Sequence, residues 1–180
     1  YNLRSGQVYT AYLLASEALN ELIQRLAQYL WMEAETADES NFDEVLERTW
    51  ASDGKIVRLE NYNDPPARGY FLRYRFAVKE EGNYTMWVAR RVEGVSPLLW
   101  SIDDNAPQPP ESNVAVGEYG EGFGWTRLGK IRLSPGFHTL ELRVVNRAGD
   151  SSTPYVQWCD VVLLTAENII PQGIVKPPVR

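Results

Sequence analysis

The sequence predicts an all-β fold, an antiparallel β-sandwich, preceded by a single N-terminal α-helix. Apolar residues between Ser5 and Leu30 recur at helical spacing, which predicts the helix. After Leu30, short β-prone runs alternate with turn-forming residues, and no helical stretch separates them. Parallel strands need long crossover connections, usually helices, so strands without them indicate antiparallel sheets.

The N-terminal helix is predicted over Ser5–Leu30, and we assign residues 1–30 to this segment. Its apolar side chains recur at i, i+3, i+4 and i+7, whereas Glu17, Glu21 and Arg25 lie mostly on the other face. An apolar stripe of this kind must be buried against another surface. That surface is the chain's own sandwich, a preceding catalytic domain or neighbouring copies of the chain.

The sandwich is predicted to occupy residues 31–165, with residues 166–180 as a linker to a further part. Tyr70–Val78 alternates apolar and polar side chains, as a strand with one buried and one wet face does. We expect one core between two sheets, containing Tyr74, Phe76, Trp87, Leu140, Leu142 and Val162. Strands are expected at Trp31–Thr36, Lys55–Glu60, Tyr70–Val78, Asn83–Val92, Leu98–Ile102, Asn113–Val116, Trp125–Leu133, His138–Val145 and Trp158–Leu164.

The composition excludes several classes of partner and site. Acidic residues outnumber basic ones by 24 to 18, and the net charge of −6 argues against nucleic acid as a partner. One histidine and one cysteine exclude a zinc finger and an internal disulfide. No run approaches the roughly 18 consecutive apolar residues that a membrane span needs.

Glu33 and Glu35 form the most informative short motif. On a strand they stand at i and i+2, so both carboxylates point to the same face and repel each other. A hard cation such as Ca²⁺ relieves that repulsion, because it prefers oxygen ligands. An exposed edge strand that carries charges against aggregation is the alternative interpretation.

Several motifs occur in an order that resembles family 6 and family 35 carbohydrate-binding modules. The resemblance covers roughly residues 31–165. Its motifs are Glu33-Ala34-Glu35, Ala51–Val57, Glu81–Arg90, Ser101–Asp104, Leu133–Leu140 and Asp160–Leu164.

The resemblance implies a β-jelly roll with a structural Ca²⁺ site. In these families two glutamates of the first strand, a carbonyl of the following loop and an aspartate of the last strand hold the metal. The corresponding residues are Glu33, Glu35, the backbone near Lys55, and Asp160.

The resemblance also implies a sugar-binding cleft among the loops at one end of the sandwich. Aromatic faces suit pyranose rings, whose C–H faces are apolar while their edges need hydrogen bonds. The stacking candidates are Tyr62, Trp125 and Trp158, with Arg68 and Gln157 as polar neighbours. Trp158 stands where the families often have Asn.

The sequence therefore predicts a non-catalytic module, secreted or at the cell surface, that binds a polysaccharide or glycan. A linked catalytic domain or further copies of the chain are the expected protein partners. The alternative is a structural subunit of an extracellular filament or surface assembly. That subunit would use the N-terminal helix and the sandwich for contacts between copies.

Overall fold

The structure is a computed structural model that describes residues 29–177. Most of the predicted helix lies outside the described residues, while Tyr29 and Leu30, expected at its end, belong to the first strand. The elements in chain order are β1 (Tyr29–Glu33), the 3₁₀ turn η1 (Ala34–Thr36), β2 (Glu39–Ser40), β3 (Glu44–Glu47), the 3₁₀ turn η2 (Ser52–Gly54), β4 (Lys55–Asn61), β5 (Tyr70–Val78), β6 (Gly82–Arg91), β7 (Leu99–Ile102), β8 (Gly117–Gly120), β9 (Phe123–Leu133), β10 (Gly136–Val144) and β11 (Tyr155–Thr165).

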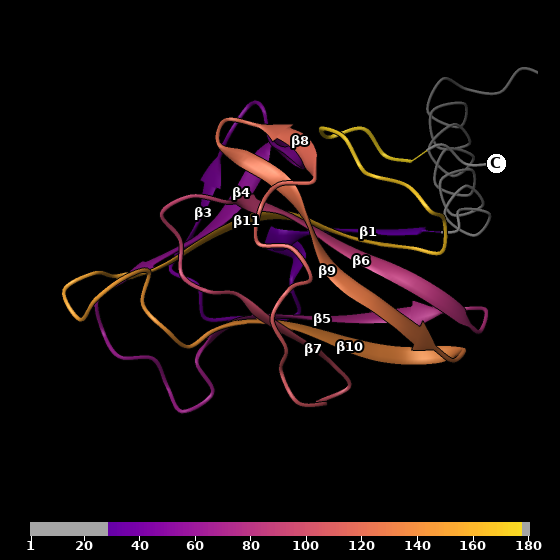
Figure 1. Cartoon of the computed structure of the whole chain (residues 1–180), viewed down its shortest axis with the longest axis horizontal. Coiled ribbons are helices and arrows are strands. Elements are labelled where there is room, and N and C mark those ends of the chain that lie inside the picture. Colours follow the sequence, from indigo (N-terminus) through magenta and orange to yellow (C-terminus); the bar gives the residue numbers. More distant parts are fainter. Residues whose placement is uncertain (1–28, 178–180) are drawn as a thin grey trace, which may run out of the picture.

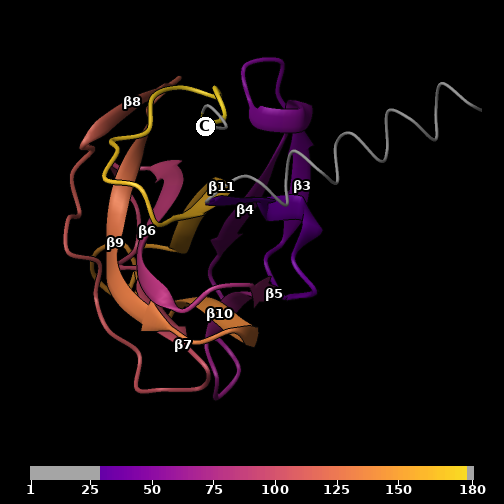
Figure 2. The same ribbon diagram turned by 90° about the vertical axis from the view of Figure 1, so that its right-hand side faces the viewer.

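Two antiparallel sheets form the layers of a sandwich (Figures 1 and 2). The large sheet has the order β3-β4-β11-β6-β9-β8, and the small sheet has the order β2-β5-β10-β7. Strand β11 pairs with β4 over its first half and with β1 over its second half, while β6 runs along its other edge. The predicted all-β, antiparallel sandwich is confirmed.

Most predicted strands lie where the sequence placed them, and three regions differ. The strand expected at Trp31–Thr36 ends at Glu33, and the next three residues form η1. The strand expected at Asn113–Val116 begins one residue after that range, because pairing with β9 starts at the Val116 N–H, 2.8 Å from the Trp125 carbonyl. The short strands β2 and β3 were not predicted.

The main core lies between the two sheets. Alternate residues of β5 point inward, and β6 contributes Met86 and Val88 from the facing sheet. Leu140, Leu142 and Val162 are completely buried there, as predicted. Each large aliphatic side chain buried in this way contributes about 1.5–3 kcal/mol to folding.

A second apolar cluster covers the outer face of the large sheet. Successive residues of a strand point to opposite faces, so Trp87 and Ala89 lie on the face opposite Met86 and Val88. Trp87 is therefore buried, but the prediction that it lies between the sheets is wrong. Trp125, Val161 and Leu163 complete the buried centre of this outer cluster.

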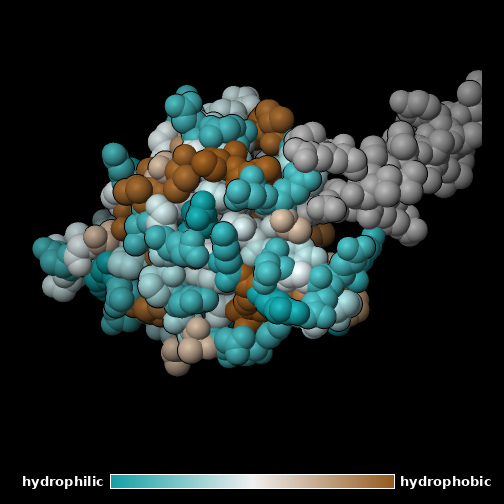
Figure 3. Space-filling model, turned by 45° about the vertical axis from the view of Figure 1, so that its right-hand side comes forward, coloured by the Kyte–Doolittle hydropathy of each residue, from teal (hydrophilic) through white to brown (hydrophobic). Residues whose placement is uncertain are grey.

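The segment that follows β11 packs on this outer face. The Gly173 N–H donates to the Glu118 carbonyl at 2.7 Å, and the Trp125 indole N–H donates to the Gly173 carbonyl at 2.9 Å. The segment thus runs beside β8 (Figure 2), where a linker was expected. Apolar side chains gather in a band near the top of the surface in Figure 3.

Among residues 29–177 no helix has the length and apolar character needed to cross a membrane.

Candidate functional site

Three acidic side chains from separate elements form what we call the carboxylate site: Glu33, Glu35 and Asp160. Glu33 ends β1, Glu35 lies in the turn η1, and Asp160 belongs to β11. The pairing of β11 with β6 shifts register between Cys159 and Val161, so Asp160 sits at a β-bulge. Bulges re-aim side chains next to functional sites, and this one turns a carboxylate of a central strand toward η2.

Asp160 is fully buried, and only one of its two oxygens has a hydrogen-bond partner. Oδ2 accepts from the Ser52 N–H at 3.1 Å and from the Tyr119 hydroxyl, whereas Oδ1 has no hydrogen-bond partner among residues 29–177. Burial raises the pKa of Asp160 to about 7, and the charges of Glu33 and Glu35 add to that rise. No basic side chain within residues 29–177 contributes to lowering that pKa.

Ser52 connects Asp160 to Glu33. Its hydroxyl donates to Glu33 Oε1 at 2.7 Å, and the Trp31 indole N–H donates to the same oxygen at 2.8 Å. Glu33 Oε2 and both oxygens of Glu35 are buried without a hydrogen-bond partner in the part of the chain that the structure describes. Burial raises the pKa of Glu35, and the charges of Glu33 and Asp53 raise it further.

Buried carboxylate oxygens without donors are costly, and a divalent cation would satisfy them. The donor set consists of oxygens only, which suits Ca²⁺. The three carboxylates do not form a closed metal cluster, since no such grouping of His, Cys, Asp and Glu occurs within residues 29–177. The fit therefore rests on the unpaired oxygens, with loop carbonyls and water needed to complete a Ca²⁺ shell.

The carboxylates approach each other for a different reason from the one the sequence suggested. Glu33 and Glu35 do not lie on the same strand, because the backbone turns into η1 after Glu33. The backbone near Lys55 follows the turn η2, in which Asp53 and Gly54 have positive φ values of 49° and 72°. The Lys55 side chain itself is exposed.

The five predicted sugar-binding residues do not form one site. Trp125 and Gln157 each have 0% exposure, so neither offers a surface to a ligand. Trp125 is enclosed by Trp31, Tyr119 and the segment after β11, and Gln157 donates to the Ser96 carbonyl inside the sandwich. The prediction that Trp125 and Gln157 contact a sugar directly is therefore corrected, because both side chains are buried.

Tyr62 and Arg68 lie apart from the outer cluster. Tyr62 is 64% exposed in the loop after β4, where Arg147 donates to its carbonyl at 2.9 Å. Arg68 reaches the small sheet and pairs with Glu141. Of the five, Trp158 alone remains at the margin of the outer cluster with part of its surface exposed.

Trp158 belongs to a surface that we call the aromatic patch: Trp50, Phe123 and Trp158 with Arg58 and Arg91. The guanidinium groups of Arg58 and Arg91 lie 5.6 and 5.3 Å from the centre of the Trp158 ring. Arg91 is the strand partner of Phe123, whose ring meets Trp50 edge-on at 4.9 Å. Cations over an indole face hold both groups in place.

The aromatic patch adjoins the carboxylate site through two short chain segments. Trp158 and Asp160 are two residues apart on β11, and Trp50 and Ser52 are two residues apart before β4. The Tyr119 hydroxyl donates to Asp160, and its ring lies 6.2 Å from that of Phe123. Together the two groups form the candidate functional site.

Sequence reasoning missed Trp50, Phe123, Arg58 and Arg91. Trp50 directly precedes the Ala51–Val57 motif, so its position was a usable signal. The contribution of Arg58 and Arg91 could not be seen, because it depends on β4 and β6 flanking β11. Phe123 gave no signal either, since its Gly-rich surroundings suggest a loop.

No protein-family model matches the chain. No curated protein matches it either. Solved structures do match. A GH26-CBM35 β-(1,4)-mannanase from Podospora anserina is 14% identical with a TM-score of 0.55, and the match covers 80% of this chain but 29% of that protein.

Two isolated modules match over almost their whole length. A family 35 carbohydrate-binding module from Clostridium thermocellum is 16% identical with a TM-score of 0.54, and the match covers 76% of this chain and 98% of the module. The C-terminal CBM6 of a marine laminarinase from Zobellia galactanivorans is 15% identical with a TM-score of 0.51, with the same two coverages. The chain thus has the β-jelly-roll fold of family 6 and family 35 carbohydrate-binding modules.

Proposed function

We propose that this chain is a non-catalytic carbohydrate-binding module whose aromatic patch binds a polysaccharide. The observation that carries the proposal is the pair of partly exposed tryptophans at the outer cluster of the large sheet, Trp50 and Trp158, with two arginines beside the Trp158 ring. Indole faces suit the C–H faces of sugars, and guanidinium N–H groups donate to their hydroxyls. The fold shared with isolated modules supports the same assignment.

The non-catalytic part of the proposal is supported by the state of the two most reactive side-chain types. His138, the single histidine, uses both ring nitrogens in contacts with Asp103 and the Ser134 carbonyl. Cys159, the single cysteine, is buried, and burial raises the pKa of its thiol to about 12. Neither group is a free base or a thiolate near pH 7.

We also propose that Glu33, Glu35 and Asp160 hold a structural Ca²⁺, with carbonyls near Lys55 contributing. The cation would supply the counter-charge that the unpaired oxygens lack, and it would fix η1, η2 and the bulge of β11 relative to one another. Because the polysaccharides that carbohydrate-binding modules bind lie outside cells, the proposal places this module in a secreted or surface protein. Linkage to a catalytic domain, as in the mannanase, belongs to the same proposal.

Replacing Trp158, a partly exposed member of the patch, tests the binding function. Trp158→Ala should weaken binding to the responsive polymer by about tenfold or more, equivalent to about 1.4 kcal/mol. The probes are soluble β-1,4-mannan and β-1,3-glucan, measured by affinity electrophoresis and calorimetry. Trp158→Phe keeps an aromatic face and should retain more of the affinity.

Phe137→Ala is the matched control, because Phe137 is 71% exposed on the small sheet, away from the patch. It should bind as the unchanged protein does. A Trp158→Ala protein that is folded by its melting curve and binds normally would contradict the patch as the binding site. Failure of the unchanged protein to bind any polymer of a broad neutral panel would contradict the function itself.

A further inference from the structure

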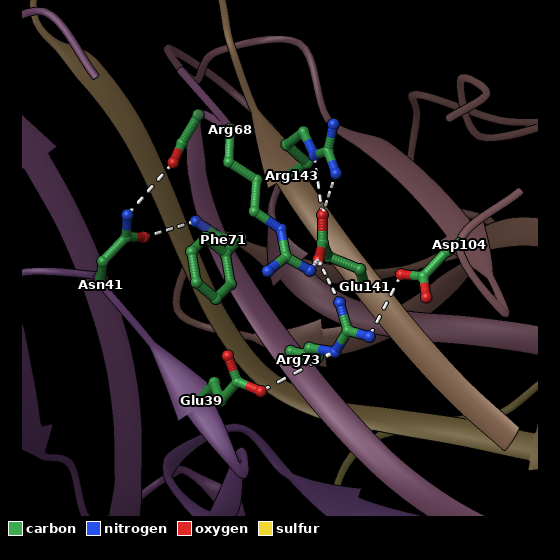
Figure 4. Close-up of polar contacts among 9 residues, drawn as sticks. Glu39, Asn41, Arg68, Phe71, Arg73, Asp104, Glu141 and Arg143 are labelled. Atoms are coloured by element: carbon green, nitrogen blue, oxygen red, sulfur yellow. Dashed lines mark hydrogen bonds and ion pairs between the residues drawn. The ribbon is translucent and has the colours of Figure 1, made fainter. Parts of the chain in front are cut away.

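A group of arginines surrounds one buried carboxylate on the outer face of the small sheet (Figure 4). Glu141 of β10 has a side chain only 4% exposed, and it pairs with Arg68, Arg73 and Arg143. Oε1 accepts from Arg143 through Nε at 2.7 Å and through Nη2, and Oε2 accepts from Arg73 at 3.2 Å and from Arg68. We call these three arginines and Glu141 the arginine face.

The arginine face carries unbalanced positive charge at one side. Arg73 has two further acidic partners, Asp104 at 3.1 Å and Glu39 at 3.9 Å. Within residues 29–177, Arg68 and Arg143 have no carboxylate partner other than the shared Glu141. One carboxylate therefore serves both guanidinium groups, in a chain whose net charge is −6.

Arg68 is held in place while a large part of it stays open to solvent. Its guanidinium group lies 4.7 Å from the centre of the Phe71 ring, and its side chain is 39% exposed. Asn41 fixes the backbone on either side of Tyr70, donating to the Gly69 carbonyl at 3.1 Å and accepting from the Phe71 N–H at 2.6 Å. Figure 4 shows Arg68, Phe71 and Arg143 lying together beside Glu141. An ordered, partly exposed guanidinium loses little entropy when it binds a ligand.

We propose that the arginine face is a second binding site, for the carboxylate or sulfate groups of an acidic polysaccharide. The planar N–H fork of Arg68 matches such anions in a bidentate manner. Arg143 uses Nε and Nη2 for Glu141, and its Nη1 group is the part that could reach a ligand. The Phe71 ring beside them offers an apolar surface to a sugar ring. That the ligand is a polysaccharide, not another polyanion, rests on the proposed function, but the site is separate from the aromatic patch.

A purely structural network around Glu141 is the competing explanation, and it makes a different prediction. A structural network stabilises the fold but gives no affinity for polyanions. A binding site gives an affinity that depends on Arg68 and falls with salt, because exposed charges are screened as the Debye length drops from about 30 Å at 0.01 M to about 3 Å at 1 M.

The experiment compares three polymers, polygalacturonate, dextran sulfate and neutral dextran, by calorimetry in about 20 mM and about 500 mM salt. The unchanged protein should bind at least one polyanion and not dextran, and high salt should weaken that binding. Arg68→Gln should weaken it by about tenfold, the loss expected for one charge-assisted contact. Glu141 keeps Arg73 and Arg143 in this variant, so the fold should persist. Arg68→Lys keeps the charge but loses the fork, and it should fall between the two.

Arg132→Gln is the control for lost charge. Arg132 is an exposed residue of β9, and its ion-pair partner is Glu81. The proposal is overturned if Arg68→Gln binds the polyanions as Arg132→Gln does, or if the unchanged protein binds neither polyanion better than dextran. Preference for one polyanion assigns the site to carboxylate or to sulfate. Equal affinity for poly-L-glutamate would overturn the polysaccharide assignment. Trp158→Ala should leave polyanion binding intact, which separates this result from the neutral-glycan test.

Discussion

His138 illustrates how single polar residues are placed in this fold. Its ring is nearly buried beside Phe76, with Nδ1 2.7 Å from Asp103 Oδ2 and Nε2 2.8 Å from the Ser134 carbonyl. Both partners are acceptors, so only the doubly protonated ring satisfies both contacts. Burial alone would lower the pKa of His138, but the contacts with Asp103 and Ser134 outweigh it and raise the pKa above its ordinary value.

A raised pKa means that the charged imidazolium stabilises the folded state. This contribution is complete below the ordinary histidine pKa of about 6.5 and is lost as the pH rises through the higher folded-state pKa. Urea unfolding between pH 5.5 and pH 9 should therefore show stability falling over that window. His138→Gln should remove this pH-dependent part. Retention of the full dependence in the variant would contradict the assignment.

The sequence pointed to Glu33, Glu35 and Asp160 through the order of its motifs, and in the structure burial and the charges of the two glutamates raise the pKa of Asp160. Their role as metal ligands stays a prediction. Trp125 could not be placed from its strand alone, since its burial depends on residues after β11. Arg68 was assigned to the wrong group, because its partner Glu141 lies 73 residues away in the chain.

At the scale of elements, strand β8 and the segment after β11 fit closely together. A Cβ atom at Gly117 would stand 2.1 Å from the Pro171 carbonyl oxygen, a distance that no side chain can occupy. The Glu118 N–H also donates to the Gln172 Oε1 atom of this segment, at 3.1 Å. Glycine at this position is thus required by the close approach of two backbones.

Gly117→Ala should displace the segment and destabilise the protein by about 1–3 kcal/mol, as other overpacked positions do. Urea unfolding measures the loss, and acrylamide quenching should rise as Trp125 becomes accessible. Gly82→Ala is the control, since its Cβ would lie an ordinary 3.5 Å from Tyr84. Equal stability of the two variants would contradict the packing described for this segment.

Strand positions followed from local pattern, whereas strand ends did not. Tyr70–Val78 was predicted to the residue, because alternation between a wet and a buried face is a local property. The ends of β1 and the start of β8 depend on which neighbouring strand supplies hydrogen-bond partners. Strand β3 carries only four residues and gave too short a pattern to recognise.

For the whole molecule, the outer cluster makes the large sheet buried on both faces. Composition and alternation predicted one core, because a two-layer sandwich needs only one. The second cluster arises since β1, the loop before β4 and the segment after β11 all contribute to the same face. Its cover comes from distant parts of the chain, and alternation within a strand does not reveal it.

A cation at the proposed Ca²⁺ site would stabilise the whole fold. A ligand that binds only the folded state stabilises it by about 2.7 kcal/mol at one hundred times its Kd. Chelation should then lower the melting temperature by roughly 5–10 °C for a chain of this size. Calorimetric melting with Ca²⁺ and with EDTA is the measurement.

Glu33→Gln combined with Glu35→Gln should abolish the response to EDTA. Glu47→Gln combined with Glu121→Gln removes the same charge from exposed positions and should leave the response intact. An unchanged protein that melts at the same temperature with Ca²⁺ and with EDTA would contradict the metal site.

The two-residue spacings that join Trp158 to Asp160 and Trp50 to Ser52 have a thermodynamic consequence. The aromatic patch and the carboxylate site share β11 and the loop before β4. A sugar bound at the patch can therefore change the affinity of the carboxylate site for a cation, and the cation can change the affinity for the sugar. Such linkage is reciprocal: the factor by which an ion strengthens adhesion to a polymer equals the factor by which the polymer strengthens retention of the ion. A module anchored on its polymer would then hold its cation at ion concentrations that strip the unanchored module.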